Sequence, residues 1–301
     1  MSEATLPTAV LGRTGLEVTR LGFGTALSRK MPDSEWDQLL NAVLDSGINF
    51  IDTANDYGVR WDVPAEEQIG KHISGRRSEY SLATKCGCGP DGGDHIWTRE
   101  NAERGLEESL RRMKTDYVDI MQYHNPTVDE AEDGDLIAVL QDMQDQGKVR
   151  WLGISTTLPH LPYYLETGVF DTFQIPYSAL EREHEDWVAK SAEAGIGIII
   201  RGGVAQGEPS GDVNERRSKK WSTFEDAGLD ELREEGESRT TLILRYTLTH
   251  PNADTNIVGT SRIPHLEENL AGIMSGPLSA DTFAEMKRRL DSVGESPAST
   301  G

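Results

Sequence analysis

Four polar residues lie at or just after the ends of short apolar segments, and their types suit proton donation to a carbonyl oxygen. They are Asp52, Tyr57, Lys85 and His124. A free tyrosine has a pKa of about 10 and donates poorly at neutral pH. The ammonium group of Lys85 would lower that pKa by favouring the tyrosinate, and Asp52 would hold Lys85 charged and in place. We therefore interpret Tyr57 as a proton donor and His124 as a group that binds the substrate oxygen or relays the proton.

Each of these residues also has a purely structural interpretation. Asp52 and Lys85 could form an ion pair that only stabilises the fold. Tyr57 could anchor a loop, and His124 could be a hydrogen-bonded core residue. Four such roles would then have to coincide on one face of the protein, so we favour the catalytic interpretation of the set.

The elements that would position these residues are short apolar segments, rich in β-branched residues, that alternate with segments of helical period. This alternation is typical of βα units around a parallel sheet. Eight such segments predict one α/β domain over 1–301, a (β/α)8 TIM barrel whose active site lies at the C-terminal ends of its strands. The expected strands are Leu21–Thr25, Asn49–Asp52, Tyr80–Lys85, Tyr117–His124, Val149–Ser155, Thr172–Tyr177, Ile196–Arg201 and Thr255–Thr260.

Three further segments are expected around the barrel. Residues 10–18 have the pattern of a β-hairpin around a glycine turn, and this hairpin could plug the barrel bottom. An extra C-terminal helix is expected over 280–293, with a disordered tail over 292–301. The stretch from 202 to 237 shows no helical pattern, so we interpret it as a lid or binding loop. It contains a basic cluster that would either close over a pyrophosphate or be solvated: Arg216, Arg217, Lys219 and Lys220.

The composition excludes several classes of partner. The chain has 51 acidic and 30 basic residues, a formal net charge of −21, so a nucleic acid or an anionic membrane surface would be repelled. No apolar stretch approaches the ~20 residues of a membrane span, and no signal-peptide pattern is found.

Cys86 and Cys88 are too close for an ordinary disulfide and too few for a four-ligand zinc site. We expect a cytoplasmic protein without membrane, nucleic-acid or metal partners.

Two stretches of sequence carry a resemblance to a known family. Residues 47–58, Gly-Ile-Asn-Phe-Ile-Asp-Thr-Ala-Asn-Asp-Tyr-Gly, and residues 106–119, with Leu-Glu-Glu-Ser-Leu-Arg-Arg-Met and Asp-Tyr-Val-Asp, are similar to signatures of the aldo-keto reductases. The resemblance extends roughly from residue 11 to residue 270. It implies an enzyme that reduces aldehydes or ketones with NADPH. The catalytic residues of the family fall on Asp52, Tyr57, Lys85 and His124.

The resemblance also implies a cofactor site. Ser155 and Gln174 would hold the nicotinamide amide, and Arg201 stands where many members stack an aromatic ring on the nicotinamide. A helix start after the last strand would bind the adenosine phosphate and, through Arg262, favour NADPH over NADH. The implied cofactor-binding residues are Gly24, Thr25, Asp52, Ser155, Gln174, Arg201, Val204, Gly207, Gly259, Ser261, Arg262, Glu268 and Asn269.

Other functions remain as alternatives. A cofactor-binding regulatory subunit that resembles the potassium-channel β subunits would share this barrel. A metal-assisted hydrolase would need several ligands at strand ends, which the sequence does not supply. The pattern Gly-x-Gly-x-x-Gly at Gly87, Gly89 and Gly92 is not interpreted as a dinucleotide fingerprint, because no helix opens directly after it. Nothing in the sequence indicates a particular carbonyl substrate or an oligomeric state.

The charge balance generates a prediction about salt. The basic residues are 21 Arg and only nine Lys, and strong acidity with few lysines is what we expect of a halophilic protein. The net charge destabilises the compact state at low ionic strength, and the Debye length falls to about 3 Å at 1 M salt. The thermal unfolding midpoint should therefore rise between about 0.1 and 2 M KCl. A flat or falling midpoint would contradict this.

Overall fold

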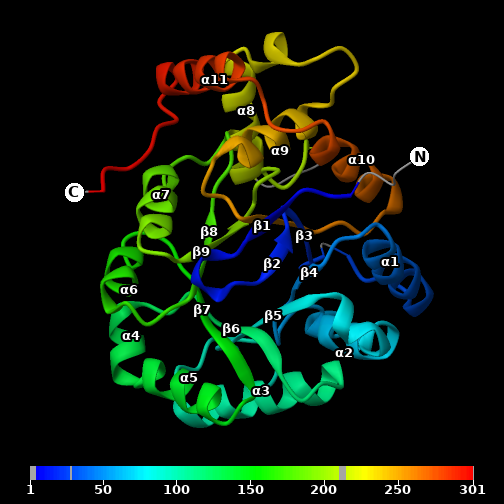
Figure 1. Ribbon diagram of the computed structural model, residues 1–301, viewed down its shortest axis with the longest axis vertical. Coiled ribbons are helices and arrows are strands. Elements are labelled where there is room, and N and C mark those ends of the chain that lie inside the picture. The colour runs from blue at the N-terminus through cyan, green and yellow to red at the C-terminus, as the bar shows by residue number, and fades with distance from the viewer. Residues whose placement is uncertain (1–4, 28, 210–214, 301) are drawn as a thin grey trace.

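The computed structural model describes residues 5–27, 29–209 and 215–300. In these residues, eight parallel strands close into a barrel surrounded by helices (Figure 1). The strands follow one another in chain order, and the last pairs with the first. The predicted TIM barrel is confirmed, with strand ends at most two residues from the expected ones. The strands are β3 (Leu21–Gly24), β4 (Phe50–Asp52), β5 (Ser81–Cys86), β6 (Val118–His124), β7 (Val149–Ser155), β8 (Thr172–Pro176), β9 (Gly197–Arg201) and β10 (Thr255–Val258).

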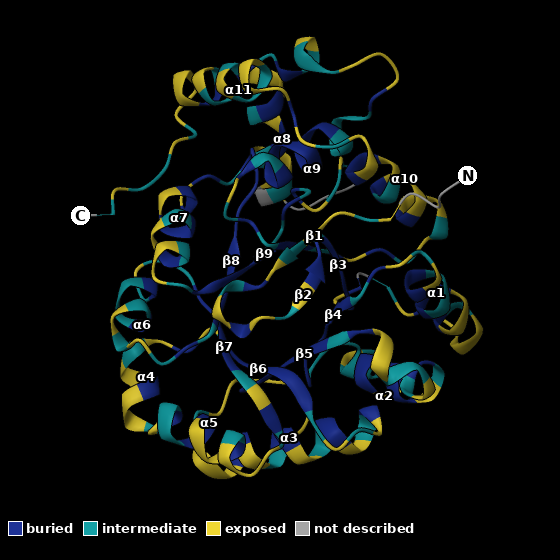
Figure 2. Ribbon diagram, in the orientation of Figure 1, coloured by how far each residue is buried: buried dark blue, intermediate teal, exposed yellow. Residues whose placement is uncertain are grey.

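The strands are buried on both faces, whereas the helices expose their outer sides (Figure 2). This burial explains why the strand segments are nearly continuous apolar runs rather than alternating patterns. The helices are α1 (Asp33–Asp45), α2 (Ala65–His72), α3 (Arg99–Met113), α4 (Val128–Asp133), α5 (Leu136–Asp145), α6 (Leu161–Thr167), α7 (Glu185–Glu193), α8 (Glu215–Asp226), α9 (Arg239–Thr249), α10 (Ile263–Met274) and α11 (Ala280–Ser292). Within the described residues, none of them is both long and apolar enough to cross a membrane.

The N-terminal hairpin closes one end of the barrel, as predicted. Strands β1 (Thr8–Val10) and β2 (Glu17–Thr19) pair antiparallel, and the 3-10 turn η1 (Gly12–Thr14) joins them. Leu11 and Val18 are fully buried in a cluster with side chains from inside the barrel, such as Phe50 and Ile120. The barrel interior is therefore filled with side chains at this end, and a ligand can only be received at the other end.

The stretch from 202 to 237 is not a single open loop, so that interpretation was wrong in part. It contains helix α8 and the 3-10 helix η4 (Leu229–Leu232). Trp221 and Phe224 lie one helical turn apart and are buried, and the Trp221 indole N–H donates to the carbonyl of Ala205 at 3.2 Å. The dense charge around these two aromatic residues hid their helical spacing in the sequence. Residues 210–214 lie outside the described part of the chain.

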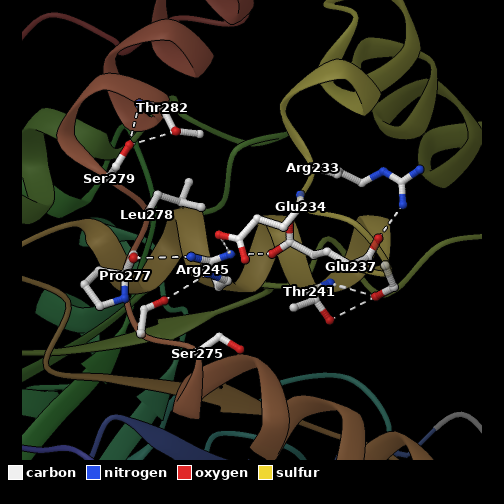
Figure 3. Close-up of polar contacts among 12 residues, drawn as sticks. Arg233, Glu234, Glu237, Thr241, Arg245, Ser275, Pro277, Leu278, Ser279 and Thr282 are labelled. Carbon is white, nitrogen blue, oxygen red and sulfur yellow. Dashed lines mark hydrogen bonds and ion pairs between the residues drawn. The ribbon is translucent and has the colours of Figure 1, made fainter.

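A buried guanidinium joins the segment before α9 to the connection between α10 and α11 (Figure 3). Arg245 donates to Glu237 at 2.8 Å and to Glu234 at 2.8 Å, and its Nε donates to the carbonyl of Gly276 at 3.0 Å. A buried charge is tolerated when it is paired and hydrogen-bonded in this way. These contacts hold the C-terminal helices against the helix that precedes the last strand.

The C-terminal helix α11 is found where the sequence predicts it. Beyond it the chain forms no helix or strand in the described residues up to 300, but it contacts the barrel. The side chain of Glu295 accepts a hydrogen bond from the backbone N–H of Arg182 at 2.6 Å, and the Ala298 N–H donates to the carbonyl of Glu183 at 2.9 Å. Part of the tail that the sequence predicts to be disordered is therefore attached by hydrogen bonds.

The packing of α2 on α3 generates a prediction about stability. A Cβ at Gly70 would lie 1.9 Å from the backbone carbonyl oxygen of Arg112, a contact that no side-chain rotation can relieve. Gly70→Ala should therefore lower the free energy of unfolding by about 1–3 kcal/mol, the usual cost of overpacking. Gly75→Ala is the matched control, because its Cβ would meet nothing within 4 Å. Equal denaturant midpoints for the two variants would contradict the close contact.

Candidate active site

The C-terminal ends of the strands bring the four predicted catalytic residues together. Asp52 ends β4, Lys85 lies one residue before the end of β5, and His124 ends β6. Tyr57 lies in the loop after β4, and its ring meets that of His124 edge-on, with centroids 5.9 Å apart. The sequence placed these residues on one face from strand order alone, and the structure brings them within contact of one another.

A buried ammonium group is the centre of this cluster. Nζ of Lys85 lies 2.5 Å from Oδ2 of Asp52, and it donates to the carbonyl of Thr53 at 2.9 Å and to the hydroxyl of Tyr57 at 3.3 Å. Neither Lys85 nor Asp52 is more than 1% exposed. All three donors of the ammonium group are therefore directed to oxygen, which is the condition for keeping such a charge in a protein interior.

Two glutamines complete the surroundings of Asp52. The side-chain amides of Gln122 and Gln174 donate to Oδ1 of Asp52 at 3.0 and 2.8 Å. Gln122 was missed by the sequence analysis, although it lies two residues before His124 and so faces the same side of β6. With one oxygen on Lys85 and the other on two amides, the Asp52 carboxylate is fixed in position.

The loop that carries Tyr57 is tied to the strands by its backbone. The N–H of Thr53 donates to the carbonyl of Ala83, and that of Asn55 donates to the carbonyl of Lys85. Gly58 then takes a positive φ of 80°, and a Cβ there would lie 2.1 Å from the carbonyl oxygen of Val63. Only glycine fits such a turn, so the chain reverses there and Tyr57 stays above Lys85.

The electrostatics of Tyr57 differ in part from the sequence-based expectation. Burial raises the pKa of Tyr57, and although Lys85 acts to lower it, the net pKa lies above the usual value. Lys85 itself has a raised pKa, because Asp52 and Tyr57 together outweigh the lowering effect of burial. Lys85 thus acts on the pKa of Tyr57 in the expected direction, but burial raises this pKa by more than Lys85 lowers it. Tyr57 is a protonated donor at neutral pH, beside a cation that can stabilise its anion.

His124 is a neutral imidazole in this environment. Burial, followed by the positive charge of Lys85, lowers the pKa of His124 to about 3. Its Nδ1 lies 3.8 Å from Oδ1 of Asp56, and neither atom has a hydrogen-bond partner among the described residues. The imidazole can therefore donate or accept one hydrogen bond at the mouth without carrying a charge there.

The expected cofactor residues surround the same mouth. Strand pairing aligns His124 with Ser155 and Ser155 with Gln174, and it aligns Asp52 with Gly24 on the other side. Thr25 donates to the hydroxyl of Thr53 at 2.8 Å. The side-chain N–H of Gln174 donates to Asp52, so its side-chain carbonyl oxygen can still accept a hydrogen bond from a ligand.

The far side of the mouth is formed by residues after β9 and β10. Arg201 ends β9 and is half-buried, Val204 packs against the core, and Gly207 has a positive φ of 73°. The carbonyl of Gly207 accepts hydrogen bonds from the guanidinium of Arg217 on α8. Lys220 from the same basic cluster pairs with Glu181 at 2.5 Å. Lys219 is exposed, and the side chain of Arg216 lies outside the described part.

The residues present fit a phosphate-bearing cofactor at the start of α10. Arg262 is the N-cap of this 12-residue helix and is exposed. Pro264 has no N–H, and the N–H of His265 donates to the carbonyl of Arg262 at 3.2 Å, so the guanidinium of Arg262 is the main group offered to a phosphate here. A Cβ at Gly259 would lie 2.9 Å from the carbonyl of Gly24, so glycine keeps these two backbones close. Asn269 is buried, and Glu268 accepts a hydrogen bond from Ser238 at 2.5 Å.

A second cation at this place was missed by the sequence analysis. Arg29, in the loop after β3, donates to the hydroxyl of Ser261 at 3.0 Å and to the carbonyl of Ser261 at 3.0 Å. The two residues are 232 positions apart, and nothing in the sequence pairs them. Arg29 also pairs with Glu35 at 2.5 Å, so it is a partly neutralised second cation beside the start of α10.

The family of the chain follows from a match over most of its length. The model of the Aldo/keto reductase family matches residues 20–291. The chain belongs to this family. As an aldo-keto reductase, it is an oxidoreductase of a group that uses nicotinamide cofactors, and its site fits a small carbonyl substrate.

Comparisons with individual proteins agree with this assignment. The holo form of an aldo-keto reductase from Bacillus halodurans superimposes with a TM-score of 0.81 at 28% identity, covering 94% of this chain and 96% of that one. The L-galactose dehydrogenase of Arabidopsis thaliana is 28% identical over 94% of both chains. A probable voltage-gated potassium channel subunit beta of Oryza sativa subsp. japonica is 35% identical over 38% of this chain and 36% of its own.

The buried pair at the centre of the site generates a prediction about stability. Asp52→Ala leaves Lys85 uncompensated, and removal of one partner of a buried ion pair typically costs about 3–5 kcal/mol. The double variant Asp52→Ala/Lys85→Met should recover most of this loss, because it removes both charges. Lys71→Ala, which breaks an exposed pair with Asp33, serves as the control and should change little. A double variant no more stable than Asp52→Ala, measured by urea unfolding, would contradict the argument.

Proposed function

We propose that this aldo-keto reductase reduces aldehydes or ketones to alcohols with NADPH, and that Tyr57 is the proton donor. The observation that carries the proposal is the buried array from Asp52 through Lys85 to the hydroxyl of Tyr57, at the open end of the barrel. When bound, the nicotinamide supplies a hydride to the carbonyl carbon. The residues of this chain then have to supply a proton to the carbonyl oxygen and stabilise the charge that develops there.

In this proposal the hydroxyl of Tyr57 supplies the proton that the carbonyl oxygen receives. This hydroxyl is protonated at neutral pH and can give its proton to the oxygen as the C=O bond becomes a C–O single bond. The tyrosinate left behind lies 3.3 Å from Nζ of Lys85, so its charge is stabilised as it forms. Asp52 and the two glutamines bound to it keep Lys85 in position throughout.

His124 would orient the substrate oxygen. A neutral imidazole beside Tyr57 can donate a hydrogen bond to the carbonyl oxygen, and this places the oxygen within reach of the phenol. A cationic imidazole would compete with Tyr57 for proton donation. The low pKa of His124, about 3, keeps the two roles separate.

Removal of the phenolic hydroxyl tests the proposal. Tyr57→Phe should lower kcat/KM for carbonyl reduction by about 10²- to 10⁴-fold, the usual contribution of a general acid. The dissociation constant for NADPH, measured by fluorescence quenching, should change little because the hydroxyl is assigned no contact with the cofactor. Wild-type turnover in the variant would show that another group supplies the proton.

The preference for NADPH is proposed from the charges at the start of α10. The 2′-phosphate is a dianion, which a protein of net charge −21 repels unless local donors outweigh the global field. The exposed guanidinium of Arg262 is such a donor, and Arg29, which also pairs with Glu35, adds a second cation beside it. The ion pair that would occupy Arg262, with Glu267 or Glu268, is absent among the described residues.

Loss of Arg262 should therefore distinguish the two cofactors. A hydrogen bond to a charged group contributes roughly 1.5–3 kcal/mol, and each 1.4 kcal/mol is about tenfold in affinity. Arg262→Ala should weaken NADPH by about 10- to 100-fold and leave NADH nearly unchanged. Titration of wild type and variant with both cofactors measures this. Equal losses for NADPH and NADH would assign Arg262 a structural role only.

A regulatory subunit is the second candidate, since two relatives are each named as a probable voltage-gated potassium channel subunit beta. The complete set of Asp52, Tyr57, Lys85 and His124 favours an enzyme. NADPH oxidation with a panel of aldehydes and ketones, including L-galactose, decides between the two. NADPH binding without turnover on any member of the panel would favour the regulatory role.

We further propose that the protein acts in a cytoplasm of high salt, because its net charge is strongly negative. The panel of substrates is therefore best assayed at molar KCl.

A further inference from the structure

Three residues with metal-binding side chains meet beside the catalytic cluster. Cys88 and His95 belong to the loop between β5 and α3, and His124 ends β6. One ligand atom from each of the three lies within 4.8 Å of the others. Cys88 and His124 are 36 positions apart, so the sequence analysis, which expected no metal, did not bring them together. The mechanism proposed above uses neither Cys88 nor His95.

The loop that carries Cys88 and His95 is held in a defined shape. The two residues face each other across an antiparallel bridge, and the N–H of Gly89 donates to the carbonyl of Asp94 at 3.0 Å. The side-chain amide of Asn101 on α3 donates to the carbonyl of Gly87 at 3.2 Å and to that of Ile96 at 2.8 Å. Both arms of the loop are thus fixed to the same helix, and the cluster does not depend on an open loop.

A fourth ligand-type group faces the cluster. Burial raises the pKa of the Cys88 thiol, and Asp56 is close enough for its charge to raise that pKa further. Oδ1 of Asp56 lies 3.8 Å from Nδ1 of His124. Both Oδ1 and Nδ1 are buried without a hydrogen-bond partner among the described residues. Most buried polar atoms are satisfied, so two orphaned atoms of metal-ligand type at one place indicate a missing partner. A substrate oxygen could satisfy the imidazole, but it would leave the carboxylate oxygen unsatisfied.

We propose that Cys88, His95 and His124 form a binding site for a zinc-type divalent cation, with the carboxylate of Asp56 next to it. Zinc takes thiolate, imidazole and carboxylate ligands in a tetrahedron with bonds of about 2.0–2.3 Å, which places ligand atoms about 3.3–3.8 Å apart. The three ligand atoms lie within 4.8 Å of one another, and the exposed side chain of His95 can rotate toward the other two ligands. Its exposure also gives the ion a path into the site.

The charges of this set suit a dication. As the bond from Sγ of Cys88 to the metal forms, the thiol proton passes to solvent, and the thiolate and the Asp56 carboxylate together balance the two positive charges. The nearby ammonium of Lys85 is already paired with Asp52. With the metal bound, His124 is no longer free to orient a carbonyl oxygen, so occupancy blocks reduction. This consequence rests on the proposed function, whereas the metal site itself does not.

Direct metal binding tests the site. Metal-free protein should take up one equivalent of Zn²⁺ in competition with a chromophoric chelator, with proton release into weakly buffered solution. Cys88→Ser, His95→Gln and His124→Gln should each weaken binding by at least about tenfold. His160→Gln is the matched control, since His160 lies on the N-cap of α6 outside the cluster. NADPH binding by each variant verifies that it is folded.

Cobalt substitution adds a signature that a structural effect would not reproduce. The Co²⁺ protein should show the near-ultraviolet thiolate-to-cobalt band and intense tetrahedral visible bands, and Cys88→Ser should lose the thiolate band. No stoichiometric binding, or equal affinity in Cys88→Ser and wild type, would overturn the proposal. With a reducible aldehyde, Zn²⁺ should inhibit wild type at least about tenfold more strongly than Cys88→Ser. A protein without any reductase activity would refute the proposed function and leave the binding test decisive for the metal.

Discussion

The ion pair between Lys85 and Asp52 is the interaction on which the site depends. It is buried at the mouth of the barrel, where an unpaired charge would be costly. To keep it, the protein directs two glutamine amides, a backbone carbonyl and a phenol at the pair. The amides come from β6 and β8, and the carbonyl and the phenol come from the loop after β4. The pair therefore fixes the relative positions of β4, β5, β6 and β8, and it holds the hydroxyl of Tyr57 beside Lys85.

The barrel and most of its mouth could be predicted because their signals are local. Each parallel strand is largely buried and appears as a short apolar run, and the polar residues of the mouth lie at or just before the ends of these runs. Asp52 and His124 follow directly from this rule. The hairpin and α11 are equally local, since glycine turns and helical periodicity mark them. The family signatures added the cofactor residues, whose roles stay predictions.

The features that escaped prediction depend on contacts between distant parts of the chain or on a mixed composition. Arg29 meets Ser261 across 232 positions, and Asp56 meets both His124 and Cys88 only because three strand ends converge. The helix α8 was missed because Trp221 and Phe224 are surrounded by charges. The net pKa of Tyr57 was missed for a quantitative reason: the sequence names the charged neighbour but does not reveal that burial outweighs it.

The plug formed by Leu11 and Val18 has a consequence for the access of ligands to the site. Because side chains fill the lower end of the barrel, every ligand that reaches His124 has to enter and leave at the open end. The N-terminal hairpin, at the opposite end of the barrel from His124, therefore determines that ligands share a single entrance.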